Sequence, residues 1–258
     1  MTATSETYEI IDVTAANVEE FGTYCIKNKK APGYHKKIEW FKKKLNDGLK
    51  IKIALDSDGK QQGFIEFIPA ENAWRPITAD GYYFIQCIVV FSKKVRNQQI
   101  GSLLINACIE EAKLNEKSGV CTMTSEGAWM ASKSIFENNH FEVVDQLDRF
   151  ELMHYPFHEA NQPPKLNDWT TKQEQYKGWN LIYADQCPWH DKSVEDLKQA
   201  AKKNGIELKI EKLEVPKSAQ NAPSGYGTYT LIKDGKLLAD HYISKTRFEN
   251  ILKKESQR

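Results

Sequence analysis

Apolar residues in the first third of the chain follow strand and helix periods in turn. Residues 7–12 (TYEIID) alternate between apolar and polar side chains, as a half-buried strand does. In residues 34–49, Ile38, Phe41 and Leu45 recur at helical spacing while the lysines fall outside that face. The pattern predicts an amphipathic helix with a solvated lysine face.

Two strands joined by a turn follow this helix. Residues 48–69 alternate on both sides of Asp-Ser-Asp-Gly at 56–59, which predicts a hairpin. Residues 81–91 (GYYFIQCIVVF) end in a run that is apolar at every position, as in a central strand buried on both faces. Further elements are predicted at residues 16–26 (helix), 120–125 (strand), 130–138 (helix), 141–146 and 150–155 (strands).

A polar, proline-containing stretch at residues 158–176 carries no apolar period and predicts a linker. Beyond it the pattern is strand, helix, strand, then a hairpin and a final helix. This order in about 80 residues is typical of a minimal thioredoxin-like fold. The predicted elements are residues 178–184, 193–204, 206–213, 228–243 and 245–254.

Composition narrows the class of protein. With 258 residues and 40% hydrophobic content, the chain can bury proper cores. Its 36 basic and 35 acidic residues leave a net charge of +1, which favours neither nucleic acid nor a membrane surface as a partner. No apolar run approaches the ~20 residues that span a bilayer, and the first ten residues are polar, so we expect a cytoplasmic protein. The five scattered cysteines form no CxxC pair and predict neither disulfides nor a metal site.

The stretch from Ile88 to Ala112 joins a buried strand to an amphipathic helix through a short basic loop. The first N–H groups of such a helix lack intrahelical partners and can bind phosphate, aided by the helix dipole. Gly101 and Ser102 stand where the helix begins, and Arg96 adds positive charge to the loop. A diphosphate would fit this arrangement.

This stretch resembles motif A of the GNAT (GCN5-related N-acetyltransferase) superfamily, whose pattern is Arg/Gln-x-x-Gly-x-Gly/Ala. The strand and helix order of residues 8–155 and the segment SIFENNHFEVVD are similar to the same superfamily, with His140 at a glycine position. The resemblance implies an α/β (α+β) fold with a mixed, mostly antiparallel sheet flanked by helices. It also implies acetyl-CoA as acyl donor, with no metal.

The resemblance implies which residues contact acetyl-CoA. Gln99 departs from the pattern because it occupies the position of the first glycine, where its side chain could crowd the diphosphate or point away from it. The implied cofactor-binding residues are Val89, Val90, Phe91, Arg96, Asn97, Gln98, Gln99, Ile100, Gly101, Ser102 and Phe136.

Direct attack of an amine on the thioester needs a base for the ammonium and an acid for the leaving thiolate. The family's usual tyrosine acid is replaced by Phe136, which leaves water, Tyr82 or Tyr83 for this role. Bases in the family are commonly carboxylates on the central strands, so Glu66 is the first candidate and Glu126 the second. A solvated strand residue is the alternative interpretation of Glu66.

Most of the chain resembles the bacterial GNAT proteins that carry a YoaP-like C-terminal domain. We therefore predict a GNAT acyltransferase domain at residues 1–157, a linker at 158–176 and a thioredoxin-like domain at 177–258. In that last domain Cys187 precedes a helix, where the dipole favours the thiolate, but His190 holds the position of a second cysteine. Cys187 is either a monothiol site or a packed helix-capping residue.

The resulting hypothesis is an acetyl-CoA-dependent N-acetyltransferase that acts on a primary amine of a small molecule or peptide. Two alternatives from other classes stay open: a non-catalytic CoA-binding sensor, and a thiol-redox protein centred on Cys187. Neither nucleic acid nor a membrane is expected as a partner, and a homodimer is left open.

Overall fold

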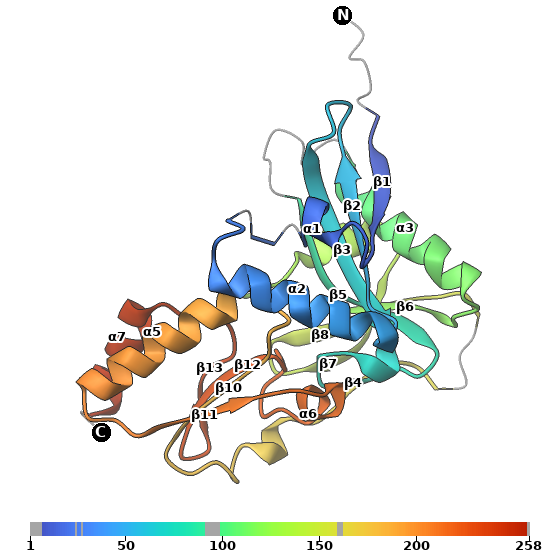
Figure 1. The fold of residues 1–258 in the computed structure, drawn as a ribbon. Coiled ribbons are helices and arrows are strands. Elements are labelled where there is room, and N and C mark those ends of the chain that lie inside the picture. Colours follow the sequence, from blue (N-terminus) through green and yellow to red (C-terminus); the bar gives the residue numbers. More distant parts are fainter. Residues whose placement is uncertain (1–6, 24, 27, 91–98, 159–161, 257–258) are drawn as a thin grey trace, which may run out of the picture. The chain divides into compact units, whose positions relative to one another are not determined.

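The computed structural model describes residues 7–23, 25–26, 28–90, 99–158 and 162–256, and the chain divides into two compact units (Figure 1). The first comprises residues 1–27, 41–73 and 77–166, and the second comprises residues 28–40, 74–76 and 167–258. Each unit has its own sheet.

The first unit is built on a seven-stranded sheet of order β1-β2-β3-β5-β6-β8-β7, in which only the β5–β6 pair is parallel. This confirms the predicted mixed, mostly antiparallel sheet flanked by helices. Its elements are β1 Glu9–Val13, α1 Val18–Phe21, β2 Lys50–Leu55, β3 Gln61–Pro69, β4 Ile77–Thr78, β5 Tyr82–Val90, α3 Ile100–Leu114, β6 Gly119–Ser125, α4 Lys133–Glu137, β7 Glu142–Leu147, β8 Phe150–Pro156 and β9 Lys165–Leu166. Strands β4 and β9 form a separate antiparallel pair.

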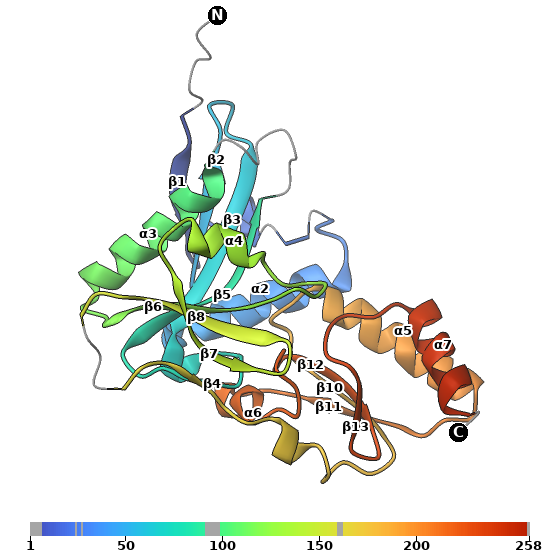
Figure 2. The ribbon, with the colours of Figure 1, turned by 180° about the vertical axis from the view of Figure 1, so that it is seen from behind.

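Helix α3 lies across one face of this sheet, and α1 lies on the other face (Figures 1 and 2). The α3 side chains Leu104, Ile105 and Cys108 pack with Ile65 and Ile85 of the sheet in one core. All five are 0–2% exposed, so the apolar face predicted for this helix is buried against the sheet.

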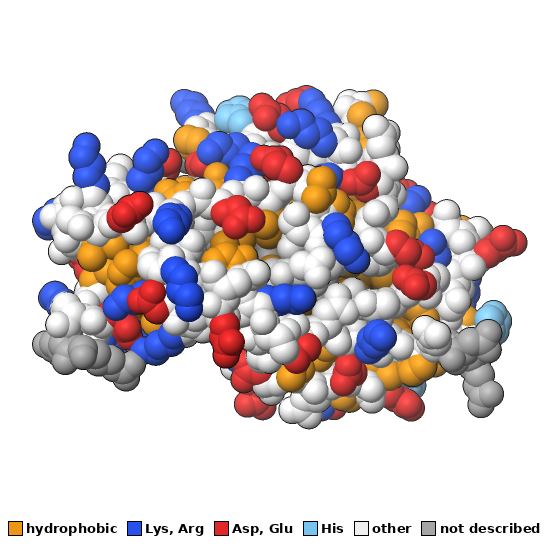
Figure 3. Space-filling model, turned by 90° about the horizontal axis from the view of Figure 1, so that it is seen from below, with side chains coloured by type: hydrophobic (Ala, Val, Ile, Leu, Met, Phe, Trp, Pro, Cys, Tyr) orange, Lys and Arg blue, Asp and Glu red, His pale blue; other side chains and the backbone are white. Residues whose placement is uncertain are grey.

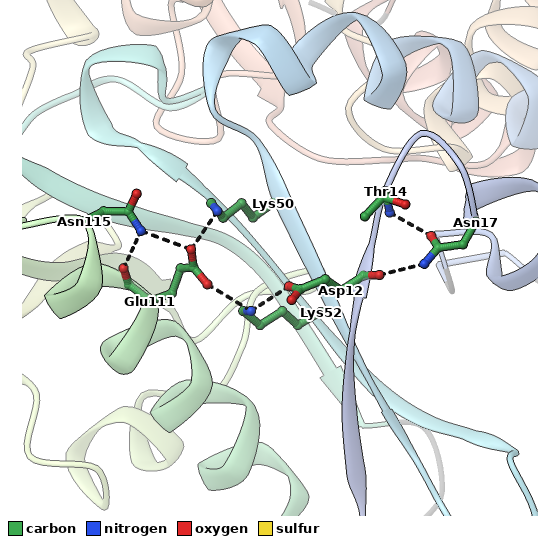
Figure 4. Close-up of polar contacts among 7 residues, drawn as sticks. All are labelled: Asp12, Thr14, Asn17, Lys50, Lys52, Glu111 and Asn115. Atoms are coloured by element: carbon green, nitrogen blue, oxygen red, sulfur yellow. Dashed lines mark hydrogen bonds and ion pairs between the residues drawn. The ribbon is translucent and has the colours of Figure 1, made fainter.

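Charged side chains also fasten α3 to the sheet (Figure 4). The Glu111 carboxylate accepts hydrogen bonds from Lys50 Nζ at 2.6 Å and forms an ion pair with Lys52 Nζ at 3.0 Å. Lys52 Nζ also donates to Asp12 Oδ1 of β1 at 2.6 Å. The pKa of Glu111 falls to about 2, because these lysine contacts outweigh the effect of burial, which acts in the opposite direction.

One extra residue interrupts the pairing of β3 with β5. Glu66 pairs with Cys87 and Phe67 pairs with Ile85, which leaves Gln86 as the extra residue of a β-bulge. The bulge explains why Ile85 and Ile88, three residues apart, both join the core beneath α3. Gln86 is thereby turned to the same face as Glu66, away from α3.

Helix α2 (Pro32–Lys44) differs from its predicted range and environment. It begins two residues earlier, and its end is followed by a 3₁₀ turn at Leu45–Asp47. Ile38 and Phe41 are buried as expected, but Lys37 is fully buried too. The prediction that all lysines of this helix are solvated was therefore wrong for Lys37.

The second unit has a four-stranded sheet of order β11-β10-β12-β13, with β10 and β11 parallel and the other pairs antiparallel. The strand–helix–strand and hairpin–helix order predicted from the sequence is present. Its elements are β10 Trp179–Tyr183, α5 Trp189–Lys203, β11 Leu208–Lys212, α6 Pro216–Gln220, β12 Tyr229–Lys233, β13 Lys236–Ala239 and α7 Lys245–Glu255. Helix α5 begins four residues before its predicted start.

Two segments from the N-terminal half of the chain are part of this second unit. Residues 28–40 include Gly33, whose Cα lies so close to the Pro188 carbonyl that an added Cβ would sit 2.0 Å from its oxygen. Residues 74–76 include Arg75, whose Nη1 donates to Thr228 Oγ1 at 3.0 Å. The C-terminal change of unit, at Leu166–Asn167, falls within the predicted linker.

The surface in Figure 3 carries interspersed basic and acidic side chains, and neither sign gathers into one patch on this face. This distribution matches the near-zero net charge. Among the described residues, no helix combines the length and apolar character that crossing a membrane requires.

Candidate functional site

The start of α3 carries the predicted diphosphate-binding backbone. Gln99 precedes the helix with φ 60° and ψ 14°, a left-handed conformation, and its side chain does not cap the helix. Among the described residues, the Leu103 N–H is the first of this helix to bond back, to the Gln99 carbonyl at 2.9 Å. The N–H groups of Ile100, Gly101 and Ser102 therefore precede the first intrahelical bond, as anion binding requires.

At two positions where the superfamily pattern has glycine, this chain has another residue whose backbone is in the left-handed conformation. Gln99 has φ 60°, and His140 after α4 has φ 64°. Glycine adopts this conformation freely, whereas other L-residues pay a steric cost. The backbone geometry thus matches the pattern even though the residue types depart from it.

Helix α4 packs against the first turn of α3. A Cβ on Gly101 would lie 2.3 Å from Ile135 Cδ1, so glycine permits this close approach. Asn139 Nδ2 donates to Ser102 Oγ at 3.0 Å and to the Ile135 carbonyl at 2.7 Å. Asn139 fixes the first turn of α3, and no feature of the sequence pattern had singled it out.

The other predicted cofactor residues lie in three settings. Val89 and Val90 are half-buried at the end of β5. Phe136 is fully buried and packs edge-on against Phe141, with ring centroids 5.5 Å apart. Phe91, Arg96, Asn97 and Gln98 lie outside the described residues.

Strands β5 and β6 separate near this helix start. Their parallel register runs from Tyr82–Gly119 to Ile85–Thr122, although both strands continue beyond it. Thr122 Oγ1 donates to the Ile85 carbonyl at 3.1 Å where the register ends. Past this point β5 stays paired with β3, and β6 stays paired with β8. The described residues thus show no β5–β6 pairing beyond Ile85 and Thr122.

Glu66 lies on β3 beside this end of the register. Its side chain is fully buried, and its Oε1 accepts a hydrogen bond from Gln86 Nε2 at 3.2 Å. The structure therefore shows that Glu66 is not the solvated strand residue of the alternative interpretation. The bulge that supplies Gln86 was not predicted from the sequence.

Tyr83 lies on the opposite face of the sheet from Glu66. It packs in the core beneath α3, with its ring 5.3 Å from that of Phe67. Burial, with a smaller contribution from the Glu111 charge, raises the pKa of Tyr83 to about 12. The structure does not bring Tyr83 and Glu66 together.

Glu126 is exposed just after β6. The loop that it begins is held by Arg149, whose Nη1 donates to Ser125 Oγ at 2.5 Å. Trp129 in the same loop is 44% exposed and has φ 70°. Glu126 thus lies on a constrained, solvent-facing loop at the carboxyl end of β6.

Cys187 belongs to the second unit, where it is half-buried ahead of α5. Its carbonyl accepts the His190 N–H at 3.1 Å. His190 is 1% exposed, and its Nδ1 bonds the Ala184 carbonyl at 2.9 Å. Within the described part of the chain, no group of three or more His, Cys, Asp or Glu side chains is placed to hold a metal ion.

Comparison with known proteins supports the resemblance seen in the sequence. The chain is 25% identical over 248 residues to the uncharacterized N-acetyltransferase YoaP of Bacillus subtilis (strain 168), covering 94% of this chain and 97% of that protein. This similarity confirms the predicted resemblance to GNAT proteins of the YoaP type. No protein-family model matches the chain.

Two solved structures are similar to part of the chain. An acetyltransferase of the GNAT family from Staphylococcus aureus Mu50 has 18% identity and a TM-score of 0.44, covering 59% of this chain and 100% of that one. A GNAT superfamily phosphinothricin acetyltransferase from Sinorhizobium meliloti, solved with acetyl-CoA, has 15% identity and a TM-score of 0.43, covering 62% of this chain and 94% of that one.

Proposed function

We propose that the first unit is an acetyl-CoA-dependent N-acetyltransferase that acts on a primary amine. The observation that carries the proposal is the first turn of α3, with its left-handed Gln99 and bare Gly101, beside the separated ends of β5 and β6. The full-length similarity to YoaP, a protein named as an N-acetyltransferase, supports the same function.

The residues around α3 fit acetyl-CoA. The N–H groups of Ile100, Gly101 and Ser102 would donate to the diphosphate, where the helix dipole adds to the attraction. The edge of β5 beyond Ile85 would take the extended part of the donor, between the two strands. Acetyl-CoA supplies the thioester whose acetyl group is transferred.

Glu66 is proposed as the base that accepts the proton of the acceptor ammonium. Its carboxylate is enclosed, and Gln86 Nε2 holds one of its oxygens in place. The free amine then attacks the thioester carbonyl, the C–N bond forms and the C–S bond breaks. The pKa of Tyr83, about 12, makes it a poor acid, and its face is opposite to that of Glu66. The second proton of the amine nitrogen is therefore proposed to pass through water to the leaving thiolate.

Calorimetry with acetyl-CoA tests the donor site. Gly101→Glu places a negative charge and a bulky side chain against the first turn of α3, and we expect it to weaken binding at least tenfold. Leu114→Glu adds the same charge at the last residue of α3, where the side chain is 81% exposed, and should leave the affinity unchanged. Equal loss of affinity in both variants, or no binding by the wild type, would contradict the proposal.

Release of free thiol in the presence of acetyl-CoA and a panel of amines, aminoglycosides, amino acids and peptides tests the base. Loss of a general base typically slows a reaction by about 10²–10⁴-fold, which is the fall expected for Glu66→Gln with acetyl-CoA affinity intact. Glu126→Gln is the matched control and should keep nearly the wild-type rate. The reverse result would make Glu126 the base, and binding without turnover of any amine would favour the sensor alternative.

A further inference from the structure

A side chain beyond the end of α4 reaches the first turn of α3, where the proposed function has the diphosphate of acetyl-CoA. Asn139 lies two residues after α4, and its Nδ2 donates to Ser102 Oγ of α3 at 3.0 Å and to the Ile135 carbonyl at 2.7 Å. Asn139 is 8% exposed and Ser102 is half-buried. The contact is therefore a mostly enclosed link between two elements of the first unit.

The bond between Asn139 and Ser102 has a defined direction. A carbonyl oxygen only accepts hydrogen bonds, so the Asn139 side-chain atom that faces the Ile135 carbonyl must be the amide nitrogen. The same nitrogen faces Ser102 Oγ, and its two hydrogens serve the two contacts. Ser102 Oγ is thus the acceptor, and the hydrogen of its own hydroxyl is not used in this bond. In the part of the chain that the structure describes, that hydroxyl makes no other hydrogen bond.

The position of Ser102 directs this hydroxyl toward the start of α3. Ser102 is the third residue of the helix, and the Cα–Cβ bonds of a helix tilt toward its N-terminus. The N–H groups of Ile100 and Gly101 lie at the same helix end. A set of donors with no acceptor among them fits an anion, because an anion only accepts.

The side chain of Asn139 does more than end a helix. Asn204 ends α5 in the same way, with Nδ2 donating to the Ala200 carbonyl four residues back at 2.8 Å. Among the described residues this is the only partner of Asn204 Nδ2, whereas Asn139 Nδ2 also bonds a side chain of another helix. Gly101 permits the approach that this second bond needs, since a Cβ there would lie 2.3 Å from Ile135 Cδ1.

We propose that Asn139 is a positioning residue for acetyl-CoA, which acts by holding Ser102 with its hydroxyl hydrogen turned toward the ligand. The Ser102 hydroxyl then donates to an oxygen of the diphosphate, and Asn139 itself does not touch the ligand. This role rests on the proposed function and extends the donor site from the backbone of α3 to a pair of side chains.

Calorimetry on the full-length protein with acetyl-CoA and with S-acetylpantetheine, which lacks the diphosphate, tests the proposal. Ser102→Ala removes a hydrogen bond to a charged group and should weaken acetyl-CoA binding about tenfold. Asn139→Leu leaves the hydroxyl to be ordered by the ligand and should weaken it about threefold. Neither variant should change the affinity for S-acetylpantetheine, whereas a general distortion of the donor site would weaken the binding of both ligands.

Two further variants separate positioning from helix capping. Asn139→Asp reverses the hydrogen bond, because a carboxylate only accepts and Ser102 would then donate away from the ligand. It also adds a negative charge, so it should weaken acetyl-CoA binding more than Asn139→Leu does. Asn204→Leu is the matched control, since it removes the same capping bond from α5 and should leave the affinity for both ligands unchanged.

The double variant Ser102→Ala/Asn139→Leu should bind acetyl-CoA as weakly as Ser102→Ala alone, because Asn139 acts through the hydroxyl that is already absent. Additive losses would contradict the positioning role. Wild-type affinity in Ser102→Ala would overturn this role while leaving the proposed function standing, and it decides the question even if the Asn139 variants do not fold. Absence of acetyl-CoA binding by the wild type would contradict the proposed function, and the positioning role with it.

Discussion

Gln99, at the start of α3, shows how much of the local structure the strand–loop–helix motif predicts. Gln99 stands where the superfamily pattern has glycine, and the sequence left open whether its side chain crowds the diphosphate. The backbone at Gln99 is left-handed and its side chain is exposed. The sequence made no prediction of this backbone conformation, which the structure adds to the motif.

Replacing Gln99 with glycine should relieve the strain of this conformation. We expect Gln99→Gly to raise the free energy of unfolding by about 0.5–1 kcal/mol, since glycine avoids the steric cost but loses more entropy on folding. It should also tighten acetyl-CoA binding, because bare backbone can approach the diphosphate more closely. Urea denaturation and calorimetry provide the two measurements.

Glu116→Gly is the control for this variant. Glu116 has φ 52° just beyond the other end of α3, so it should give a similar gain in stability with no change in acetyl-CoA affinity. If both variants destabilise the protein, the left-handed residues are held by contacts that outweigh their strain.

Among the elements, α3 depends on charge as well as on its apolar stripe. Its hydrophobic positions were predictable from the sequence because they recur at helical spacing. The ion pairs of Glu111 with Lys50 and Lys52 were not, since they join residues about 60 positions apart through strand register. The bulge at Gln86 was missed for the same reason: an apolar run carries no mark of where one residue fails to pair.

Glu111→Gln should lower the free energy of unfolding by about 1–2 kcal/mol at pH 7, because Lys52 is mostly buried and loses one of its partners. The pKa of Glu111 is lowered to about 2 in the folded protein, against about 4.3 in an unfolded chain. Its contribution is therefore complete above about pH 4.3 and is lost as the pH falls toward 2.

Urea denaturation between pH 2 and pH 7 measures this loss. Wild type and Glu111→Gln should differ at pH 7 and converge near pH 2. Glu110→Gln is the matched control: its partner Lys113 is half-exposed, so its effect should stay within about 0.5 kcal/mol. A pH-independent difference between wild type and Glu111→Gln would reject the assigned pKa.

At the scale of the whole molecule, the sequence predicted two consecutive domains, whereas the second compact unit includes residues 28–40 and 74–76. The order of strands and helices could be predicted because it depends on local periodicity. Which unit a segment belongs to depends on contacts between residues far apart in the sequence, such as Gly33 with Pro188 and Arg75 with Thr228.

A fragment of residues 177–258 alone should therefore be less stable than the same region in the full chain. It lacks the ion pair of Lys36 with Asp191 and the buried Trp74 and Arg75, so we expect a loss of about 3 kcal/mol or more in the free energy of unfolding. Urea denaturation followed by circular dichroism measures it. Addition of a peptide of residues 28–40 should restore part of the stability, and an unchanged midpoint for the isolated fragment would contradict the assignment of these segments.

The bulge in β5 has a consequence for how this sheet tolerates insertions and deletions. Loss of a codon within residues 82–85 would move the preceding side chains of the strand to the wrong face. Loss of the Gln86 codon alone would keep Glu66 opposite Cys87 and Phe67 opposite Ile85, and Ile88 would still face α3. The strand pairing on either side would therefore survive this deletion, whereas Glu66 would lose the hydrogen bond that Gln86 Nε2 donates to its Oε1.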